Sequence, residues 1–282
     1  MATNFEILKN CLNGGNNNEA ANILAELCTA FRDCNSYSSC IKRILHWGCL
    51  SNGRRFFTDY RDESIFRDKF NFNSFIRTEN NRYAFDLCYA ISENPGKLFN
   101  PCLITGGTGL GKTHLLHSIR VKLEEEKPDS TVLYLKCKDF INEFISSVCN
   151  NSQNRFVKKY HSADVLLLDD FQYMCNKPAT QSELIDIFED LLGNDCQLVL
   201  TCSYSPNELT GLSERMKSYI TSAAQAKISV PDKEAKLHIL RYKFAEAGIP
   251  AKEETINEIA DKSSDVRSLL SGVKNVLADS YK

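Results

Sequence analysis

The chain contains, at residues 106–113, the glycine-rich sequence Gly106-Gly107-Thr108-Gly109-Leu110-Gly111-Lys112-Thr113. It matches the pattern G-x-x-x-x-G-K-[ST], whose glycines allow backbone N–H groups to close around phosphate oxygens. The apolar segment Cys102-Leu103-Ile104 precedes it, and a helical pattern follows from Leu115 to Glu126. Because this order points the positive N-terminal end of a helix at the phosphates, we predict a nucleoside triphosphate site. Lys112 is expected to neutralise the β- and γ-phosphates, and Thr113 to bind magnesium.

A site of this kind needs a second element, an apolar strand that ends in an acid, and Val165-Leu166-Leu167-Leu168-Asp169-Asp170 supplies it. Two adjacent carboxylates at the buried end of a strand are too costly without a cation, so a role as a mere strand cap is the weaker interpretation. We expect Asp169 to orient the magnesium shell and Asp170 to polarise the attacking water.

Guanine recognition would need an Asn-Lys-x-Asp loop after a later strand. Asn176-Lys177-Pro178-Ala179 has the wrong last residue and comes too early, so ATP is preferred to GTP. The predicted catalytic residues are Asp170, Asp169 and Lys112, and the predicted magnesium residues are Thr113 and Asp169.

From about Phe70 onward, apolar strands alternate with amphipathic helices. Further strands are expected at residues 131–135, 165–168 and 197–201, and helices at residues 115–126, 139–148 and 181–192. This alternation predicts an α/β fold with a parallel, doubly wound sheet. After Pro231, helical patterns at residues 234–246, 252–261 and 266–279 predict a C-terminal helical lid. Short helical patterns near the N-terminus predict a small helical region for docking or packing, so the expected domains are residues 1–69, 70–231 and 232–282.

Composition limits the classes of function. The chain has 282 residues, with 34 basic and 36 acidic side chains and a formal net charge of −2. A dedicated duplex-DNA binder usually carries a basic surplus, so strong independent duplex binding is disfavoured. The 12 cysteines include no Cys-x-x-Cys pair, which disfavours a zinc site and fits a reducing compartment. Because no run of about 18 apolar residues occurs, we expect no membrane span and a cytoplasmic location.

From about Phe72 to its end, the chain resembles the AAA+ domain of the DnaA family, the bacterial chromosomal replication initiators. The resemblance implies an AAA+ P-loop NTPase fold and an ATP-controlled switch that assembles on origin DNA and helps to open it. It rests on order and spacing as well as on the motifs themselves. The matching stretches are Phe99-Asn100-Pro101, the loop of residues 106–113 with His114-Leu115-Leu116-His117, Leu167-Leu168-Asp169-Asp170-Phe171-Gln172, Arg215-Met216-Lys217-Ser218 and Asp265-Val266-Arg267-Ser268-Leu269.

Three positions take their expected roles from this resemblance. Arg267 matches the lid arginine that contacts the bound nucleotide, and Ser203 occupies the first sensor position, where the family usually carries a polar or acidic residue. Arg215 matches a basic position in the motif that faces a neighbouring subunit. The predicted nucleotide-binding residues are therefore Gly106, Gly107, Thr108, Gly109, Leu110, Gly111, Lys112, Thr113, His114, Ser203 and Arg267.

The chain also departs from the family pattern. Tyr219 stands where the family carries its arginine finger, and a neutral phenol cannot replace a guanidinium beside a developing phosphate charge. ATP hydrolysis is therefore expected to be slow.

A basic position that the family uses for single-stranded DNA falls near Ala179, while its apolar partner position is Ile145. Arg155, Lys158 and Lys159 can compensate, although a solvated helix face is the commoner explanation of such a cluster. The sequence stops at Lys282, where the family would begin its helix-turn-helix domain, so sequence-specific duplex binding is not expected of this chain alone.

Two hypotheses of different classes remain. In the first, the chain is a DnaA-like switch in the initiation or regulation of chromosomal replication, with ATP or ADP and magnesium as cofactors. It would self-assemble or join another DnaA-type subunit, and single-stranded DNA is a candidate partner. In the second, it is a DnaA-related adaptor or helicase-loading regulator that docks on another AAA+ subunit, with little ATPase activity or duplex binding. Tyr219 favours the second hypothesis.

Overall fold

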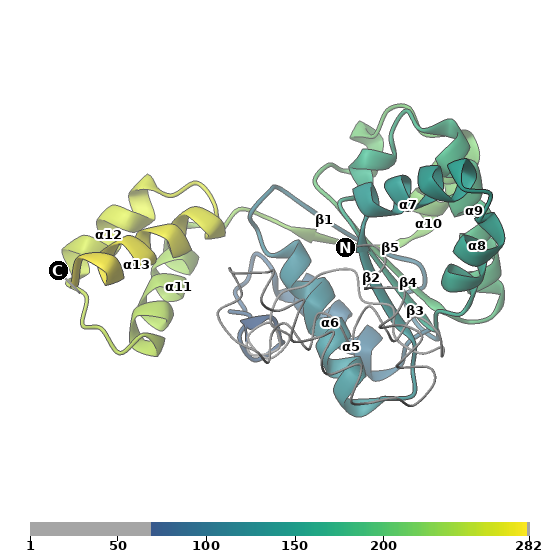
Figure 1. The fold of residues 1–282 in the computed structure, drawn as a ribbon. Coiled ribbons are helices and arrows are strands. Elements are labelled where there is room, and N and C mark those ends of the chain that lie inside the picture. Colours follow the sequence, from purple (N-terminus) through teal and green to yellow (C-terminus); the bar gives the residue numbers. More distant parts are fainter. Residues whose placement is uncertain (1–68, 281–282) are drawn as a thin grey trace, which may run out of the picture. The chain divides into compact units, whose positions relative to one another are not determined.

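The computed structural model describes residues 69–280 of the chain (Figure 1). All of them belong to the second of two compact units, which runs from Phe56 to Lys282. The predicted N-terminal helical region therefore lies outside the described residues, apart from Lys69.

A five-stranded sheet of order β2-β3-β4-β1-β5 forms the centre of the fold, and every neighbouring pair of its strands is parallel (Figure 1). The predicted α/β class and parallel sheet are confirmed. The strands are β1 (Cys102–Gly106), β2 (Val132–Lys136), β3 (Val165–Asp169), β4 (Gln197–Cys202) and β5 (Ala224–Ile228).

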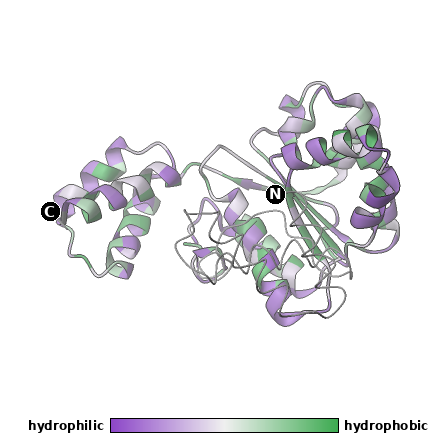
Figure 2. Ribbon diagram, viewed as in Figure 1, coloured by the Kyte–Doolittle hydropathy of each residue, from purple (hydrophilic) through white to green (hydrophobic). Residues whose placement is uncertain are grey.

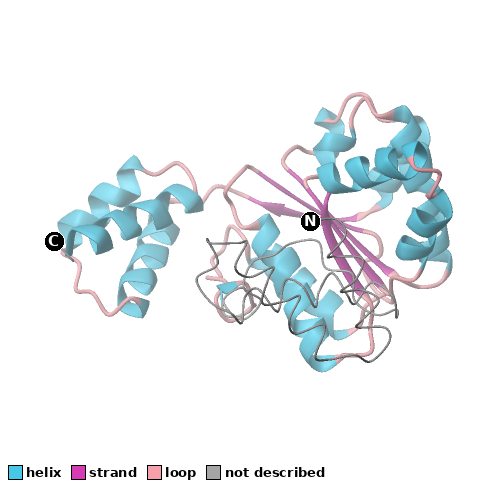
Figure 3. Ribbon diagram, viewed as in Figure 1, coloured by secondary structure: helices cyan, strands magenta, loops and turns pink. Residues whose placement is uncertain are grey.

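Helices cover both faces of this sheet (Figures 1 and 3). Alternate residues along each strand point to opposite faces. One face carries Ile104 and Leu167 in a cluster with α5 and α6, whereas the other carries Leu103 and Leu168 in a cluster with α7 to α10. Because both faces are covered, the central strands are apolar along their length (Figure 2). The helices are α5 (Arg82–Glu93), α6 (Lys112–Glu126), α7 (Cys137–Cys149), α8 (Gln153–His161), α9 (Pro178–Gly193) and α10 (Glu214–Ser222). Two short 3-10 turns, η2 (Phe171–Met174) and η3 (Pro206–Glu208), follow β3 and β4.

Several boundaries differ from the sequence expectation. The sequence patterns do not predict α5, α10 or β5. In β5 every second residue faces outward and only Ala226 and Ile228 are buried, because β5 pairs with β1 alone at the edge of the sheet. The helix expected at residue 139 begins at Cys137, so Asp139 lies in its first turn instead of capping it.

The lid consists of three helices, α11 (Lys233–Glu246), α12 (Glu253–Lys262) and α13 (Val266–Ser280). Leu240, Ile256 and Leu269 are members of its apolar core. α12 and α13 approach closely at Gly272, where an added Cβ would lie 2.5 Å from Ile259 Cγ2. In the part of the chain that the structure describes, none of the helices combines the length and apolar character that a membrane crossing requires.

Candidate functional site at the carboxyl end of the sheet

The predicted site residues meet where three adjacent strands end. β1 ends at Gly106, β3 at Asp169 and β4 at Cys202, and these strands are neighbours in the order β3-β4-β1. Parallel sheets bind ligands beyond the carboxyl ends of their strands, where the strand order reverses. Here β1 lies between β4 and β5, so the loop of residues 106–113 starts at such a reversal. We call the carboxyl ends of β1, β3 and β4 together with this loop the loop edge.

Glycines shape the loop because side chains would fill it. Gly109 has φ +80°, and a Cβ there would lie 2.9 Å from Asp265 Oδ2 and 3.2 Å from Arg267 Cβ. Gly111 has φ +102°, and its Cβ would lie 3.0 Å from Phe75 Cε2. Both conformations are unfavourable for side-chain-bearing residues. The loop is therefore a backbone cradle, which fits the binding of phosphate groups at the start of α6.

Lys112 is the first residue of α6, and only 6% of its surface is exposed. Its Nζ donates to the carbonyls of Gly106 at 2.6 Å and Gly107 at 2.9 Å, and to Ser203 Oγ at 3.3 Å. Burial lowers the pKa of Lys112, and the carboxylates of Asp170 and Asp169 oppose that shift. The cation is thus held at the loop edge by neutral oxygens.

Asp169 is 1% exposed, and its carboxylate accepts hydrogen bonds from three hydroxyl groups. Thr113 Oγ1 donates to Oδ2 at 2.7 Å, and Tyr134 Oη donates to the same oxygen at 3.2 Å. Thr201 Oγ1 donates to Oδ1. A buried carboxylate is tolerated when its oxygens are satisfied in this way. The two predicted magnesium residues, Thr113 and Asp169, are therefore in direct contact.

Asp170 lies directly after β3 in the left-handed conformation, with φ +61° and ψ +50°. Its N–H donates to Thr201 Oγ1 at 2.9 Å, and its Oδ1 accepts from Gln172 Nε2 at 2.9 Å. Gln172 Oε1 in turn accepts from the N–H of Ser203 at 3.1 Å. The predicted residues Asp170 and Ser203 are therefore connected through one glutamine side chain.

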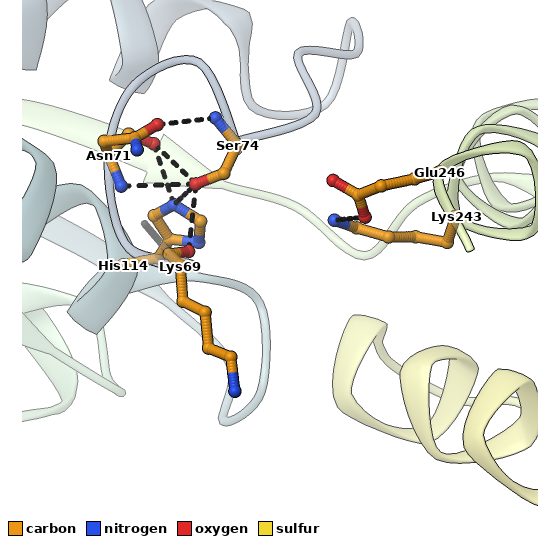
Figure 4. Close-up of polar contacts among 6 residues, drawn as sticks. All are labelled: Lys69, Asn71, Ser74, His114, Lys243 and Glu246. Atoms are coloured by element: carbon orange, nitrogen blue, oxygen red, sulfur yellow. Dashed lines mark hydrogen bonds and ion pairs between the residues drawn. The ribbon is translucent and has the colours of Figure 1, made fainter. Parts of the chain in front are cut away.

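His114 connects α6 to the segment that precedes the sheet (Figure 4). Its Nε2 lies 3.0 Å from the carbonyl of Asn71 and 3.2 Å from Ser74 Oγ. Because a carbonyl only accepts, Nε2 carries the hydrogen. The ring also makes edge contacts with Phe70 and Phe75, at centroid distances of 5.3 Å and 5.1 Å. Burial above all lowers the pKa of His114 to about 4.

Arg267 is the second residue of the lid helix α13 and is exposed, and a Cβ added to Gly109 would lie beside its own Cβ. The turn that carries it is held by reciprocal bonds: the N–H of Ser268 donates to Asp265 Oδ1 at 2.7 Å, and the N–H of Asp265 donates to Ser268 Oγ at 3.1 Å. Electrostatic repulsion from Arg267 contributes to the lowered pKa of Lys112. The two cations therefore act on the same region of the loop edge.

Arg215 and Tyr219 lie on α10, away from these residues, and both contact Glu189 of α9. Arg215 Nη2 forms an ion pair with Glu189 Oε1, and Tyr219 Oη donates to the same oxygen at 2.9 Å. The hydrogen bond from Tyr219, followed by Arg215, holds the pKa of Glu189 below its ordinary value. We call Glu189, Arg215 and Tyr219 the α9–α10 surface.

The residues expected near DNA lie on other helices. Ile145 of α7 is 53% exposed, and Val148 beside it is 45% exposed, while Ala179 of α9 is also exposed. Lys159 of α8 forms an ion pair with Glu143 at 2.7 Å. Arg155 and Lys158 of α8 are exposed.

Three residues that contact the predicted acids were not predicted: Thr201, Tyr134 and Gln172. Thr201 is buried within an apolar strand, where a hydroxyl needs a polar partner, so its place two residues before Ser203 was a usable signal. Gln172 lies two residues after Asp170, and this short spacing was a usable signal as well. Tyr134 lies on β2, and only the pairing of β2 with β3 brings it to Asp169.

Together these residues provide a phosphate cradle, a buried lysine, a carboxylate with a threonine hydroxyl beside it, and a second acid nearby. Within residues 69–280, no three His, Cys, Asp or Glu side chains gather in a metal-binding cluster. The donor set of Thr113 and Asp169 fits a magnesium ion, which usually takes only one or two protein ligands and completes its shell with phosphate oxygens and water.

The sequence and the fold both match known proteins. The profile of the family described as the bacterial DnaA ATPase domain matches residues 66–226. The chain is 39% identical over 222 residues to the chromosomal replication initiator protein DnaA of Borrelia hermsii (strain HS1 / DAH), which covers 78% of this chain and 46% of that protein. The chain thus spans about half the length of the curated relatives it matches.

Solved structures of DnaA proteins share the fold. The crystal structure of domain III from the Thermotoga maritima replication initiation protein DnaA has a TM-score of 0.71 and 30% identity, covering 74% of this chain and 88% of that one. A replication initiator DnaA bound to AMPPCP and single-stranded DNA has the same TM-score and identity, covering 74% of this chain and 64% of that one.

Proposed function

Because this chain belongs to the bacterial DnaA family, we propose that it is an ATP-binding switch protein in the initiation or regulation of chromosomal DNA replication. It acts by nucleotide-dependent assembly at the replication origin, in the cytoplasm. The domains of this switch are residues 70–231 for nucleotide binding and residues 232–282 for the lid, with residues 1–69 as a partner-docking region.

The observation that carries this proposal is the meeting of charged groups at the loop edge. Lys112 comes from the start of α6, Asp169 and Asp170 come from the end of β3, and Arg267 comes from the lid. A cation on a separate helical subdomain beside the phosphate cradle reports whether the γ-phosphate is present. A switch requires such a connection between the nucleotide and the lid, whereas a protein that only binds nucleotide does not.

The roles of the chain's own residues follow from their contacts. Lys112 neutralises phosphate charge from the base of the cradle, and the N–H groups at the start of α6 donate to phosphate oxygens. Thr113 and Asp169 would hold magnesium, which would supply positive charge to neutralise the phosphates. Asp170 accepts a proton from the attacking water. The water oxygen bonds to the γ-phosphorus as the bond to the β-phosphate oxygen breaks, giving ADP and inorganic phosphate.

Single-stranded DNA is the proposed nucleic-acid partner. A solved DnaA structure of the same fold contains AMPPCP and single-stranded DNA. In this chain, Ile145 and Val148 expose apolar surface on α7, and Arg155 and Lys158 are exposed on the adjacent α8. Apolar side chains next to cations suit a strand whose bases are unpaired.

The α9–α10 surface favours a second candidate function. Tyr219 occupies the arginine-finger position, and Arg215 is paired with Glu189 inside the chain. A subunit of this kind binds ATP yet contributes little to hydrolysis in a neighbour. The alternative is therefore an adaptor or helicase-loading regulator that docks on another AAA+ subunit.

Two experiments test the two candidates. Purified protein with ATP, at low salt, is expected to form oligomers on single-stranded DNA in analytical ultracentrifugation, and Lys112→Ala is expected not to do so. The switch proposal is overturned if the protein stays monomeric with ATP and does not bind single-stranded DNA. If instead a full-length DnaA-type initiator from the same cell forms an ATP- or ADP-dependent complex with the chain, the adaptor is supported, and the absence of any complex counts against it.

A further inference from the structure

Gln172 makes two hydrogen bonds that join separate parts of the loop edge. It lies half-buried in η2, two residues after Asp170. Its Nε2 donates to Asp170 Oδ1 at 2.9 Å, and its Oε1 accepts from the N–H of Ser203 at 3.1 Å. The side chain therefore spans the gap between the residues that follow β3 and those that follow β4.

Chemistry dictates which way this amide faces. The N–H of Ser203 can only donate, so it requires the amide oxygen. The carboxylate of Asp170 can only accept, so it requires the amide nitrogen. A flipped amide would place donor against donor and acceptor against acceptor, which the hydrogen-bond network excludes. Glutamine satisfies both neighbours at once because it carries one acceptor and one donor group.

The backbone of Asp170 is fixed independently of Gln172. The left-handed conformation is unfavourable for a residue other than glycine, so other contacts must hold it. The bond from the Asp170 N–H to Thr201 Oγ1 does so, and Thr201 is tied in turn to Asp169. With the backbone anchored to β4, the bond from Gln172 decides where the carboxylate of Asp170 points.

Ser203 connects the other end of the amide to the phosphate cradle. Its Oγ accepts from Lys112 Nζ at 3.3 Å. A continuous path thus runs from Lys112 through Ser203 and Gln172 to Asp170. Linked hydrogen bonds of this kind hold each other in place, since loss of one partner leaves the next one misdirected.

We propose that Gln172 is a positioning residue that aims the carboxylate of Asp170 at the attacking water and links this aim to Ser203 and Lys112. This proposal rests on the proposed ATP hydrolysis. Gln172 itself touches neither water nor phosphate in this role. Its contribution belongs to the rate of the chemical step and not to the affinity for ATP.

The test compares Gln172→Glu and Gln172→Met with the unaltered chain and with Gln225→Glu, which adds the same charge at an exposed glutamine of β5. ATP binding is measured with a fluorescent ATP analogue, and hydrolysis by release of labelled phosphate over hours. Both Gln172 variants are expected to lower kcat by about 10- to 100-fold, which is part of the about 10²–10⁴-fold that a positioned general base contributes. KM and ATP affinity should stay within about threefold of the parent.

The pH profile separates positioning from a general loss of structure. An ionised glutamate at residue 172 faces Asp170 with a like charge, but its protonated form again offers one donor and one acceptor. The kcat of Gln172→Glu, relative to the parent, should therefore rise as pH falls from 8 to about 5.5, whereas that of Gln172→Met should not. Gln225→Glu should match the parent throughout.

The experiment distinguishes failure of the proposed function from failure of the role proposed for Gln172. Absence of ATP binding by the unaltered chain overturns the proposed function itself. ATP binding without any phosphate release overturns the role of Gln172, because Asp170 then has no reaction to serve. Full activity of both Gln172 variants, or a relative kcat of Gln172→Glu that does not change with pH, overturns it as well.

Discussion

At the loop edge, charged side chains are held by neutral groups, whereas on the α9–α10 surface they are paired with each other. Lys112 donates to two carbonyls and a hydroxyl, and Asp169 accepts from three hydroxyls. Arg215, in contrast, forms an ion pair with Glu189, and Tyr219 donates to the same carboxylate oxygen.

This difference indicates how each region is used. A buried charge that is held by neutral groups keeps most of its attraction for an external ion, because its partners are not themselves charged. An exposed arginine that is already paired with a carboxylate must break that pair before it can contact another molecule. The loop edge thus suits a charged ligand, whereas the charges of the α9–α10 surface are neutralised by each other.

The largest expected effect comes from removing the buried cation. Lys112→Ala should weaken ATP binding by about 100-fold, since a charge-assisted hydrogen bond to a phosphate is worth up to about 3 kcal/mol. Isothermal titration calorimetry measures the change, with Lys122→Ala near the other end of α6 as the control. Unchanged ATP affinity in Lys112→Ala would contradict the assignment of the loop edge as a phosphate site.

Mutation can remove the contacts with Glu189 that neutralise the α9–α10 surface. Tyr219→Arg combined with Glu189→Gln should raise ATP hydrolysis at least about 10-fold in the assembled state, because a guanidinium supplied to a neighbouring site stabilises the transferring phosphate. In dilute protein without DNA the rate should not change. Tyr219→Phe, which removes only the bond to Glu189, is the control, and an equal rise in dilute protein would show that the effect does not act between subunits.

A smaller effect is expected where the lid approaches the cradle. Gly109→Ala should weaken ATP binding by about 10-fold, because the added Cβ would meet Asp265 and Arg267. Gly248→Ala is a matched control, since Gly248 also has a positive φ of +68° but would place its Cβ in open space. Equal losses of affinity in the two variants would mean that backbone strain, and not the lid contact, is responsible.

The smallest effect concerns pH. Burial lowers the pKa of His114 to about 4 and that of His117 to about 3. Below the ordinary pKa of 6.5 the unfolded chain binds protons that the folded chain does not, so stability is lost as pH falls. Between pH 7.5 and about 5 each histidine contributes at most about 2 kcal/mol, or about 4–8 °C in Tm.

Thermal unfolding across this pH range measures the histidine contribution. His114→Gln keeps an N–H for the carbonyl of Asn71 but cannot be protonated, so its Tm should fall less steeply with pH than that of the parent. Identical slopes would show that His114 is not protonated preferentially in the unfolded chain.

Local signals sufficed for much of the fold, and they predicted residues that the structure brings together at the loop edge. The glycine loop, the run of apolar residues before Asp169 and the alternation of strands and helices predicted the parallel sheet, and the structure confirms it. Lys112, Thr113 and Asp169 were predicted because each belongs to a motif whose spacing encodes its geometry. β5 was missed because an edge strand buries only alternate residues and has no continuous apolar run.

Other relations depend on packing between distant segments. Tyr134 reaches Asp169 from the neighbouring strand, and Gln172, which follows β3, reaches Ser203, which follows β4. The contact of Glu189 with Arg215 and Tyr219 depends on how α9 packs against α10. Sequence spacing does not reveal such contacts, because they join residues about 30 positions apart.

The amino-acid sequence was enough to predict the phosphate loop and its acids and to single out Tyr219, since covalent neighbours carry that chemistry. Only the tertiary structure decided that Asp170 is held by Gln172 and that Arg215 is neutralised within the chain. The physical reason is that a hydrogen bond or an ion pair depends on distances of about 3 Å. The packing of separate strands and helices sets those distances, and no local pattern specifies them.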